Sequence, residues 1–179
     1  MSMINVISVN RQNLTDLNVL QCGSEMCSPG HFFGPAVRDY YLIHYIKSGC
    51  GVFQVHDKTY NLSKGQGFLI KPGILSYYRA CVNDPWYYSW IGFNGLRAEE
   101  YLLRSGFTKT NPVFEYKKDE FIQNCFDEIM NSDKKSFSKE LRITGYLYLF
   151  FSALIEENIT VYGYREKSSG NQRGLHQCL

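Results

Sequence analysis

The side chains best suited to chemistry in this sequence are aromatic. The densest group is Trp86-Tyr87-Tyr88-Ser89-Trp90. Alternate side chains of an extended strand share a face, so Trp86, Tyr88 and Trp90 are expected to point the same way. Flat rings with N–H and O–H groups suit a small polyhydroxylated ligand, whose C–H faces stack and whose hydroxyls need partners. Ordinary core packing is the alternative and stays open for Trp90 at this point.

Residues for metal or nucleophilic catalysis lack the spacing that such sites use. A metal site needs three or four converging donors, but the histidines form no His-x-His or His-Glu-x-x-His motif. They are His31, His44, His56 and His176. Acidic pairs such as Glu99-Glu100 are sequence neighbours, which on a helix point about 100° apart. Nucleophile-elbow, Walker and dinucleotide-binding motifs do not occur. We therefore predict no catalytic residues, no metal ligands and no cofactor.

The composition is that of an ordinary globular protein with one main domain. The 179 residues are 44% hydrophobic and 20% charged, which argues against disorder and against a disulfide-stabilised miniprotein. The 19 Lys and Arg residues are nearly balanced by 17 Asp and Glu residues. Domains that neutralise nucleic-acid phosphates usually have a clear excess of base. These residues alone are therefore not expected to bind DNA.

The N-terminus and the cysteines indicate a cytoplasmic protein. Residues 1–13 lack a basic start followed by an apolar run, so no secretory signal is expected. The uncharged stretch from Ile143 to Ile155 is shorter than the about 20 residues that cross a bilayer, so no membrane partner is predicted. The cysteines form no Cys-x-x-Cys pair and are expected to be reduced, mostly as small core residues. They are Cys22, Cys27, Cys50, Cys81, Cys125 and Cys178.

Residues 17–93 have the pattern of a β-rich domain. Short segments rich in Tyr, Phe, Val, Ile and Trp alternate with turns such as Lys71-Pro72-Gly73. The predicted strands are Asn18–Cys22, Tyr40–Lys47, Gly51–His56, Lys58–Leu62, Gly67–Lys71, Tyr77–Cys81 and Trp86–Phe93. Their spacing of roughly ten residues is typical of a β-sandwich or a small barrel, such as the cupin jelly roll. Counting strands does not separate these two architectures.

After Phe93 the spacing of apolar residues becomes helical. Helices are predicted over Leu96–Ser105, Asp119–Asn131 and Ser138–Glu157. The third is apolar around so much of its circumference that we expect one side to face its own domain and another to face a second copy of the chain. The side chains assigned to that homodimer interface are Leu147, Phe150, Phe151 and Leu154. Full burial within one chain is the alternative.

Several segments of the sequence carry a family resemblance when they are taken in order. They are Cys22–Pro35, Arg38–Ile46 with Ser48–Gly51, Gly65–Gly73 and Pro85–Phe93. Together they resemble the N-terminal effector domain of AraC-type transcriptional regulators, and the likeness is strongest over residues 18–106. The resemblance implies an α+β fold: a cupin-like double-stranded β-helix, or jelly-roll barrel, that binds a sugar and is followed by two or three helices through which subunits dimerise. A C-terminal DNA-binding domain with two helix-turn-helix motifs normally follows. We expect it to be absent here, so that DNA is bound only through that missing domain.

The resemblance also implies sugar contacts. In such domains a Trp and a polar residue two positions before it contact the sugar, and these correspond to Trp90 and Tyr88. A Tyr a few residues past the Pro-Gly turn corresponds to Tyr78. The arabinose-responsive member of the family has a histidine where this chain has Tyr88. The same sugar is therefore not implied.

Two charged residues and one histidine complete the predicted ligand site. If its strand begins by residue 38, Arg38 shares parity with His44, and its guanidinium enters the barrel and offers fixed donors to sugar hydroxyls. Glu25 can accept hydrogen bonds from two vicinal hydroxyls. The alternatives are that Arg38 pairs with Asp39 or lies on the surface, and that Glu25 is exposed in a loop.

The predicted organisation is one effector-binding and dimerisation domain over residues 1–165. It comprises an arm (1–13), a jelly roll (14–116) and a helical dimerisation segment (117–160), and a linker-like tail (166–179) follows. A small sugar effector would shift an equilibrium between arrangements of the arm or of the dimer. A metal-dependent cupin enzyme acting on a sugar, and a dimerisation module with a vestigial pocket, are the alternatives.

Overall fold

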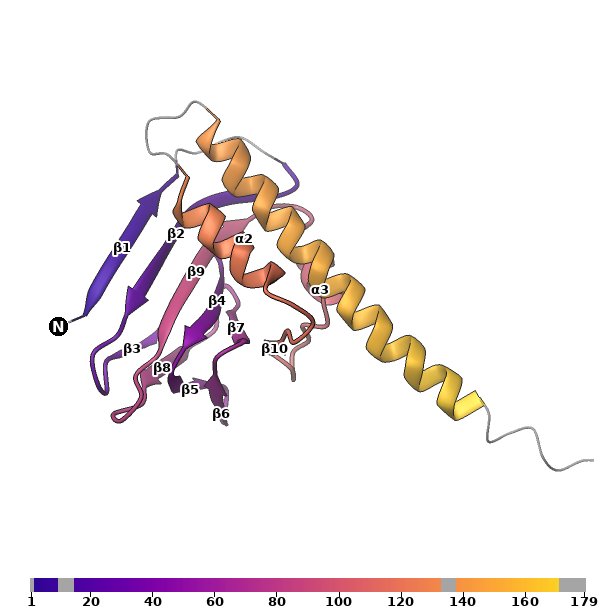
Figure 1. The fold of residues 1–179 in the computed structure, drawn as a ribbon, viewed down its shortest axis with the longest axis horizontal. Helices are drawn as coiled ribbons and strands as arrows, with labels where there is room; N and C mark the ends of the chain where they lie inside the picture. The colour runs from indigo at the N-terminus through magenta and orange to yellow at the C-terminus, as the bar shows by residue number, and fades with distance from the viewer. Residues whose placement is uncertain (1, 10–14, 133–137, 171–179) are drawn as a thin grey trace, which may run out of the picture.

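Two antiparallel sheets and three helices make up the computed structural model, which describes residues 2–9, 15–132 and 138–170 (Figure 1). One sheet has six strands in the order β1-β2-β9-β4-β7-β10, and the other has four in the order β3-β8-β5-β6. The strands are β1 (Met3–Ser8), β2 (Asn18–Met26), β3 (Phe32–Ala36), β4 (Tyr41–Ser48), β5 (Cys50–Val55), β6 (Lys58–Ser63), β7 (Gln66–Ile70), β8 (Ser76–Ala80), β9 (Tyr87–Asn94) and β10 (Val113–Glu115). The helices are α1 (Ala98–Arg104), α2 (Phe121–Met130) and α3 (Lys139–Gly170).

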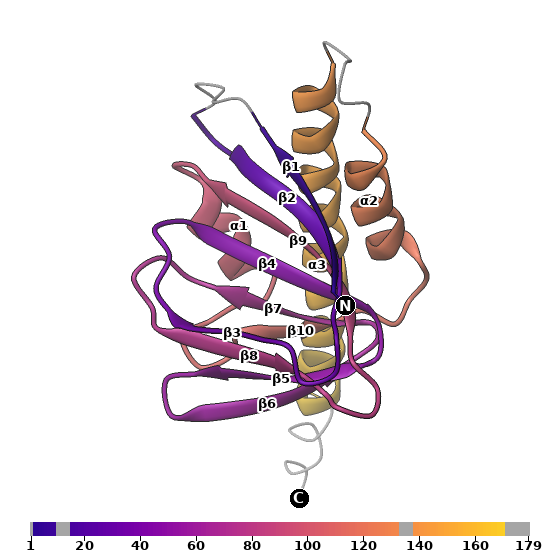
Figure 2. The same cartoon turned by 90° about the vertical axis from the view of Figure 1, so that its left-hand side faces the viewer.

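The six-stranded sheet is the middle layer of the molecule. The four-stranded sheet covers one of its faces, and the helices cover the other. Figure 2 shows the strands stacked with β1 at one end and β6 at the other, and with α2 and α3 behind them. Strands β4 and β9 are therefore buried on both faces, which explains why their sequences are nearly continuous apolar runs.

Side chains of opposite parity on these strands enter two separate hydrophobic clusters. Ile43 and Ile91 face the helices, whereas Leu42 and Trp90 face the second sheet. The helix–sheet cluster consists of Ile7, Leu17, Val19, Cys22, Ile43, Tyr45, Leu69, Ile91, Phe93, Ala98, Leu102, Phe107, Tyr116, Ile122, Phe126, Ile129, Ile143, Leu147, Phe150, Phe151, Ala153 and Leu154. The inter-sheet cluster consists of Cys27, Leu42, Ile46, Phe53, Val55, Leu62, Phe68, Ile70, Tyr78, Ala80, Trp86, Tyr88 and Trp90.

All seven predicted strands are present with small shifts at their ends, and three further strands were not predicted. One of these is β1, which lies within the segment expected to be an arm and pairs with β2 from Met3 opposite Met26 to Ser8 opposite Gln21. Its sequence, Met-Ile-Asn-Val-Ile-Ser, does not alternate apolar and polar residues. Ile7 is buried, whereas Ile4 and Val6 are exposed. Residues 10–13 of the expected arm lie outside the described residues.

Helix α3 is longer than predicted. It continues past the expected end at Glu157 to Gly170, and so includes residues 166–170 of the segment predicted to be a linker. No proline interrupts residues 158–170, and Arg, Glu and Lys in this stretch have high helix propensity. The rest of that predicted linker, residues 171–179, lies outside the described residues.

The four side chains predicted to form a dimer interface lie inside the chain instead. Leu147, Phe150, Phe151 and Leu154 are each at most 3% exposed and belong to the helix–sheet cluster. Their wide apolar arc arises because α3 packs against α1, α2 and β2 together. The structure therefore corrects their assignment to a partner-facing surface, and any dimer through α3 must use other side chains.

Cysteine burial and helix length test two further predictions. Cys22, Cys27 and Cys125 are buried free thiols, as predicted for most cysteines, whereas Cys50 and Cys81 are half-exposed. Cys178 lies outside the described residues.

Within residues 2–9, 15–132 and 138–170, no helix is both long enough and apolar enough to cross a membrane.

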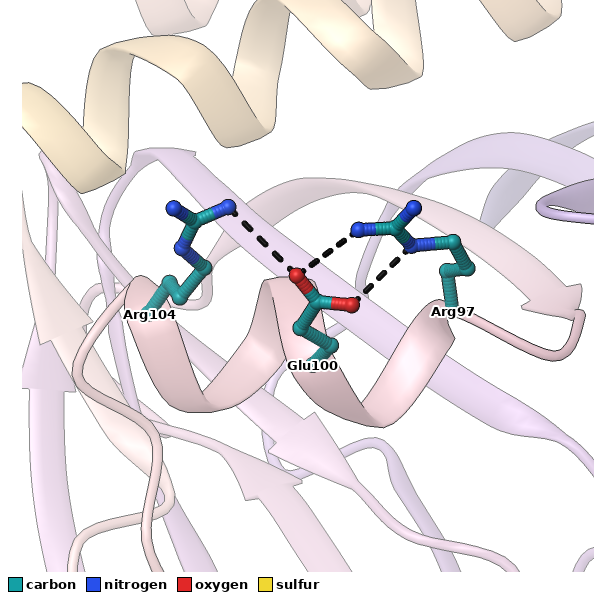
Figure 3. Close-up of polar contacts among 3 residues, drawn as sticks. All are labelled: Arg97, Glu100 and Arg104. Carbon is teal, nitrogen blue, oxygen red and sulfur yellow. Dashed lines mark hydrogen bonds and ion pairs between the residues drawn. The ribbon is translucent and has the colours of Figure 1, made fainter.

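The solvent side of α1 carries a small cluster of ion pairs. The Glu100 carboxylate accepts hydrogen bonds from Nε and Nη2 of Arg97 at 3.0 and 2.8 Å, and it lies 3.5 Å from Nη1 of Arg104 (Figure 3). The hydrogen bonds from Arg97 lower the pKa of the Glu100 carboxyl from its ordinary value. Spacings of three and four residues bring these groups together on one helix face, where such exposed pairs contribute little to stability.

Candidate functional site

A cavity of about 230 Å³ lies between the two sheets, beside strand β1. All six residues predicted to bind a ligand line it, although they come from β2, β4, β8, β9 and the segment before β4. The complete lining consists of Ile4, Val6, Gln21, Glu25, His31, Phe33, Arg38, Leu42, His44, Tyr78, Tyr88 and Trp90. The fold therefore brings the predicted residues together at one place.

Strand register explains why these side chains converge. Glu25 of β2 lies opposite Tyr88 of β9, and Gly23 lies opposite Trp90. On the other side of β9, His44 of β4 is also opposite Trp90. Residues directly opposite in an antiparallel pair project to the same face, so the side chains enter the space between the sheets together.

Gly23 makes room for the indole of Trp90. A Cβ atom at this glycine would lie 2.3 Å from Cζ2 of the Trp90 ring and 2.6 Å from the backbone oxygen of Asn5. The ring therefore lies directly over the backbone of β2. A residue with any side chain at position 23 would displace the indole or the strand β1.

Glu25 is a buried carboxylate held by two neighbours. It is 6% exposed, its Oε2 accepts a hydrogen bond from the Tyr88 hydroxyl at 3.0 Å, and its Oε1 lies 3.2 Å from Nε2 of His31. A buried charge needs such partners. Burial raises the pKa of Tyr88 above its ordinary value, so its hydroxyl stays neutral and donates. The alternative that Glu25 is an exposed loop residue is excluded.

Arg38 reaches the cavity from a loop and not from a strand. Strand β4 begins at Tyr41, so the condition that the strand starts by residue 38 is not met. The guanidinium lies over the Phe33 ring, 4.5 Å from its centroid, and its Nη1 donates to the Tyr40 hydroxyl at 3.1 Å. Burial raises the pKa of the neighbouring Tyr78 to about 12, against the opposing effect of the Arg38 charge.

His44 is the most deeply buried polar residue of the cavity. It is 1% exposed, and its ring stacks on Phe68 with centroids 4.4 Å apart. Burial, and then the positive charge of Arg38, lower its pKa well below the ordinary value, so the imidazole is neutral. Its Nδ1 is buried without a hydrogen-bond partner. An unsatisfied buried nitrogen costs about 1–3 kcal/mol, which a polar ligand in the cavity can recover.

Other lining residues were not predicted from the sequence. Strand β2 extends to Met26, so Gln21 and Glu25 project from the same face of one strand. A predicted strand of that length would have placed Gln21 beside Glu25. His31 follows a turn, and Ile4 and Val6 belong to β1, so no local pattern connects them with the site. Only the pairing of distant segments reveals these three.

One group of potential metal donors lies beside the cavity. A carboxylate oxygen of Glu25, the thiol of Cys27 and a ring nitrogen of His31 all lie within 4.8 Å of one another. Three such donors resemble the protein part of a zinc site with an open position. Burial, reinforced by the Glu25 charge, raises the pKa of Cys27 to about 12, so the thiol is protonated in this arrangement. Glu25 already contacts His31 and Tyr88.

Comparison with known families decides what kind of domain contains this cavity. The model described as the AraC-like ligand binding domain matches residues 18–151. The chain belongs to the family of AraC-like ligand-binding domains. The predicted α+β fold, a cupin-like jelly roll followed by helices, is confirmed. All cavity residues of this AraC-like domain except Ile4 and Val6 lie within the matched range.

Curated relatives of this AraC-like domain are named as operon regulators. The Msm operon regulatory protein of Streptococcus mutans is 35% identical over 158 residues, which cover 88% of this chain and 57% of the relative. The Lactose operon transcription activator of Staphylococcus xylosus is 27% identical over 150 residues, 82% of this chain and 53% of the relative. The chain thus spans just over half the length of both relatives.

A solved structure supports the fold alone. The protein YhaK from Escherichia coli superposes with a TM-score of 0.50 at 13% sequence identity, over 66% of this chain and 53% of that chain. At this identity the AraC-like domain shares an architecture with YhaK, and nothing about ligands is transferred.

Proposed function

We propose that this chain is the sugar-sensing and dimerisation domain of an AraC-type transcriptional regulator, and that the cavity between the sheets binds a small sugar. The observation that carries the proposal is the convergence of Trp90 with Glu25 and Arg38 on one cavity. The indole offers a face for sugar C–H groups, the carboxylate accepts hydrogen bonds from hydroxyls, and the guanidinium donates them.

Cavity size and charge narrow the ligand class. The volume of about 230 Å³ is below the range of about 300–1,000 Å³ typical for drug-sized ligands, so one sugar ring suits it better than a larger molecule. The buried Glu25 carboxylate disfavours an anionic ligand through charge repulsion. Neutral His44 can satisfy its unpartnered Nδ1 with a sugar hydroxyl. A neutral monosaccharide unit is the ligand that these features support best.

The names of the relatives support a regulatory role. Both are regulators of operons, and one is a lactose operon activator. In this proposal DNA is contacted by another domain of the regulator, because the near-balanced charge of this chain does not suit phosphate binding. The chain itself performs no catalysis.

Strand β1 gives a route from ligand binding to regulation. Ile4 and Val6 line the cavity from β1, which lies at the edge of the six-stranded sheet and pairs with β2. A ligand in contact with these side chains favours the paired position of β1 over any detached one, since it interacts with only one of the two states. A coupling of about 1–3 kcal/mol is enough for a regulatory switch.

We still propose that the chain forms a homodimer through α3, but through exposed side chains of that helix. Leu141, Tyr148 and Leu149 are exposed on α3, and Gly145 between them has open space around it. We assign the dimer contact to this face in place of the four buried residues. Leu149→Asp should then convert dimers to monomers in light scattering, whereas Leu96→Asp, at an exposed position before α1, should not. Dimers that persist in Leu149→Asp contradict this assignment.

Isothermal titration of mono-, di- and trisaccharides into the wild-type chain and Trp90→Ala tests the sugar site. The wild type should bind at least one sugar, and Trp90→Ala should lose binding while light scattering shows the oligomer unchanged. Tyr87→Ala is the matched control, because Tyr87 is adjacent but not part of the cavity lining. Unchanged affinity in Trp90→Ala contradicts the site. If no sugar stabilises the wild type in a thermal-shift screen, the vestigial-pocket alternative is favoured.

A metal-dependent cupin enzyme is the second candidate, and the Glu25–Cys27–His31 group is the observation that favours it. Elemental analysis of purified protein separates the two functions. Stoichiometric iron, manganese or zinc that is lost in Cys27→Ser, together with turnover of a sugar, supports the enzyme. Sugar binding by metal-free protein supports the sensor.

A further inference from the structure

The half-exposed thiols of Cys50 and Cys81 form a pair on adjacent strands, away from the sugar cavity. Strands β5 and β8 are antiparallel, with Gly51 opposite Ala80. One residue further along, Cys50 begins β5 and Cys81 directly follows β8. The Cys81 N–H donates to the Cys50 carbonyl at 3.0 Å, so the two residues lie opposite each other. Side chains of opposed residues project to the same face.

This arrangement meets the geometric needs of a disulfide. Opposed residues in antiparallel strands have Cα atoms about 4.5–5.5 Å apart, within the about 4.4–6.8 Å that disulfides span. The neighbouring Cys81 thiol, more than burial, raises the pKa of Cys50 to about 11. The other described cysteines are buried.

Small oxidants can reach this pair. Cys50 and Cys81 line a surface concavity of about 370 Å³ together with Arg79, Asn83 and Asp84. The Cys50 thiol donates to the Asp84 carbonyl at 3.4 Å, and the Cys50 N–H donates to the same oxygen at 2.9 Å. The loop from β8 to β9 is thus held against the start of β5, and the thiols stay in register at an accessible position.

We propose that Cys50 and Cys81 form a reversible intrachain disulfide when the chain meets hydrogen peroxide or a small-molecule disulfide. With peroxide, the two thiols give up two protons and two electrons, an Sγ–Sγ bond forms, the O–O bond breaks and two water molecules leave. With a disulfide oxidant, a mixed disulfide forms first, and two small thiols are released. Dithiothreitol reverses either reaction. Because the thiolate is the nucleophile and Cys50 has a raised pKa, oxidation should accelerate as the pH rises from 7 to 9.

The disulfide would stabilise the backbone on which the rings of Trp86 and Tyr88 pack. A Cβ atom at Gly51 would lie 2.3 Å from the Trp86 ring, so that ring rests on the backbone beside Cys50. Trp86 in turn meets Tyr88 edge-on, with centroids 5.8 Å apart. Linking β5 to the end of β8 restricts the opening of this region, and the melting temperature should rise on oxidation.

Peptide mass spectrometry of the full chain, treated with hydrogen peroxide or oxidised glutathione, tests the proposal. The expected product is a Cys50–Cys81 linked peptide that appears faster than any other oxidation and disappears with dithiothreitol. Cys50→Ser and Cys81→Ser should each abolish it, and Cys125→Ser should retain it. Circular dichroism establishes that the variants fold. Wild-type protein that keeps both thiols while other cysteines oxidise, or that forms only links between chains, overturns the proposal. No sugar is needed, so the outcome is independent of the proposed function.

Discussion

The two hydrophobic clusters on either face of the six-stranded sheet contain similar side chains, but only the inter-sheet cluster combines them with inward polar groups beside the candidate cavity. In the helix–sheet cluster, rings such as Phe126, Phe150 and Phe151 contact one another edge-to-face beneath α3. In the inter-sheet cluster, Glu25 and His44 project among the rings and a cavity remains. Aromatic content alone therefore does not distinguish a core from a binding site. The two clusters differ because polar groups, Glu25 and His44, project inward in the inter-sheet cluster.

This contrast has an energetic meaning. The packed rings of the helix–sheet cluster stabilise the free protein, because their burial needs no ligand. The inter-sheet cluster leaves the Nδ1 atom of His44 unsatisfied and part of its volume empty. A ligand that supplies the missing contacts stabilises the folded chain by mass action.

Removal of a ring from the helix–sheet cluster should have the largest effect on stability. Phe150 is 2% exposed, so Phe150→Ala should lower the free energy of unfolding by about 3–5 kcal/mol. Urea unfolding measures the loss, and titration at low temperature should find the sugar affinity unchanged. A loss below about 1 kcal/mol would contradict the packing of α3 against the sheet.

Gly23→Ala should affect the cavity more than the rest of the fold. The added Cβ would meet the Trp90 ring at 2.3 Å, so the indole must move. We expect a loss of about 1–3 kcal/mol in unfolding free energy from overpacking and at least about tenfold weaker sugar binding, equal to about 1.4 kcal/mol.

Gly145→Ala is the matched control for sugar binding, because its Cβ would meet nothing within 4 Å and Gly145 is not part of the cavity lining. Since Gly145 lies on the α3 face assigned to the dimer contact, its effect on stability is measured in the Leu149→Asp background, where the higher helix propensity of alanine should stabilise the chain by up to about 1 kcal/mol. Sugar affinity that falls equally in both variants would show that Gly23 has no special relation to Trp90.

The pH dependence of stability should report the buried His44. In the unfolded chain its pKa is about 6.5, whereas the folded value is well below this. Between these two values the unfolded state binds more protons, so stability is fully present above pH about 6.5 and is lost as the pH falls towards the folded pKa. His44→Gln should make the free energy of unfolding decline less between pH 7 and 5, measured with urea.

His56 provides the control for that experiment. It is exposed, with a φ of 52°, and asparagine tolerates this left-handed conformation. His56→Asn should keep the slope of the wild type. An equal change of slope in both variants would mean that the pH dependence does not arise from the cavity.

The smallest effect is expected on the surface of α1. Glu100 forms ion pairs with both Arg97 and Arg104 on the exposed side of α1 (Figure 3). Because water screens such pairs, Glu100→Gln should leave both the melting temperature and the sugar affinity unchanged within experimental error. By contrast, Glu25→Gln, at the buried carboxylate, should weaken sugar binding in the same titration. A lower melting temperature for Glu100→Gln would show that the ion pairs of α1 matter to the fold.

Much of the fold was predictable because strand periodicity is a local property. The run from Trp86 to Phe93 showed its buried character in its own residues, and β9 is indeed central to the sheet. The edge strand β1 was missed because its pairing depends on backbone hydrogen bonds to β2 and not on its own pattern. The extent of α3 was also missed, since propensity marks helix ends weakly.

The sequence predicted which residues line the candidate site, but not how they are arranged. Resemblance and strand parity selected Tyr88 and Trp90, and the acceptor chemistry of a carboxylate selected Glu25. All three line one cavity. Arg38 was selected on a strand start that the structure does not have, and it reaches the cavity from a loop. His31 was missed because its closeness to Glu25 comes from a turn whose course the sequence does not specify.

The sequence by itself determined which segments are extended, which are helical and which side chains share a strand face, because these follow from backbone geometry and the spacing of neighbouring residues. Only the tertiary structure decided which face of the sheet packs rings under the helices and which also encloses polar groups beside a cavity. Phe150 and Trp90 are alike in kind, but Phe150 packs against Phe114, Phe126 and Phe151, whereas Trp90 lies opposite Gly23 and His44 and shares its cavity with Glu25. That distinction depends on contacts between residues far apart in the chain, which no local pattern contains.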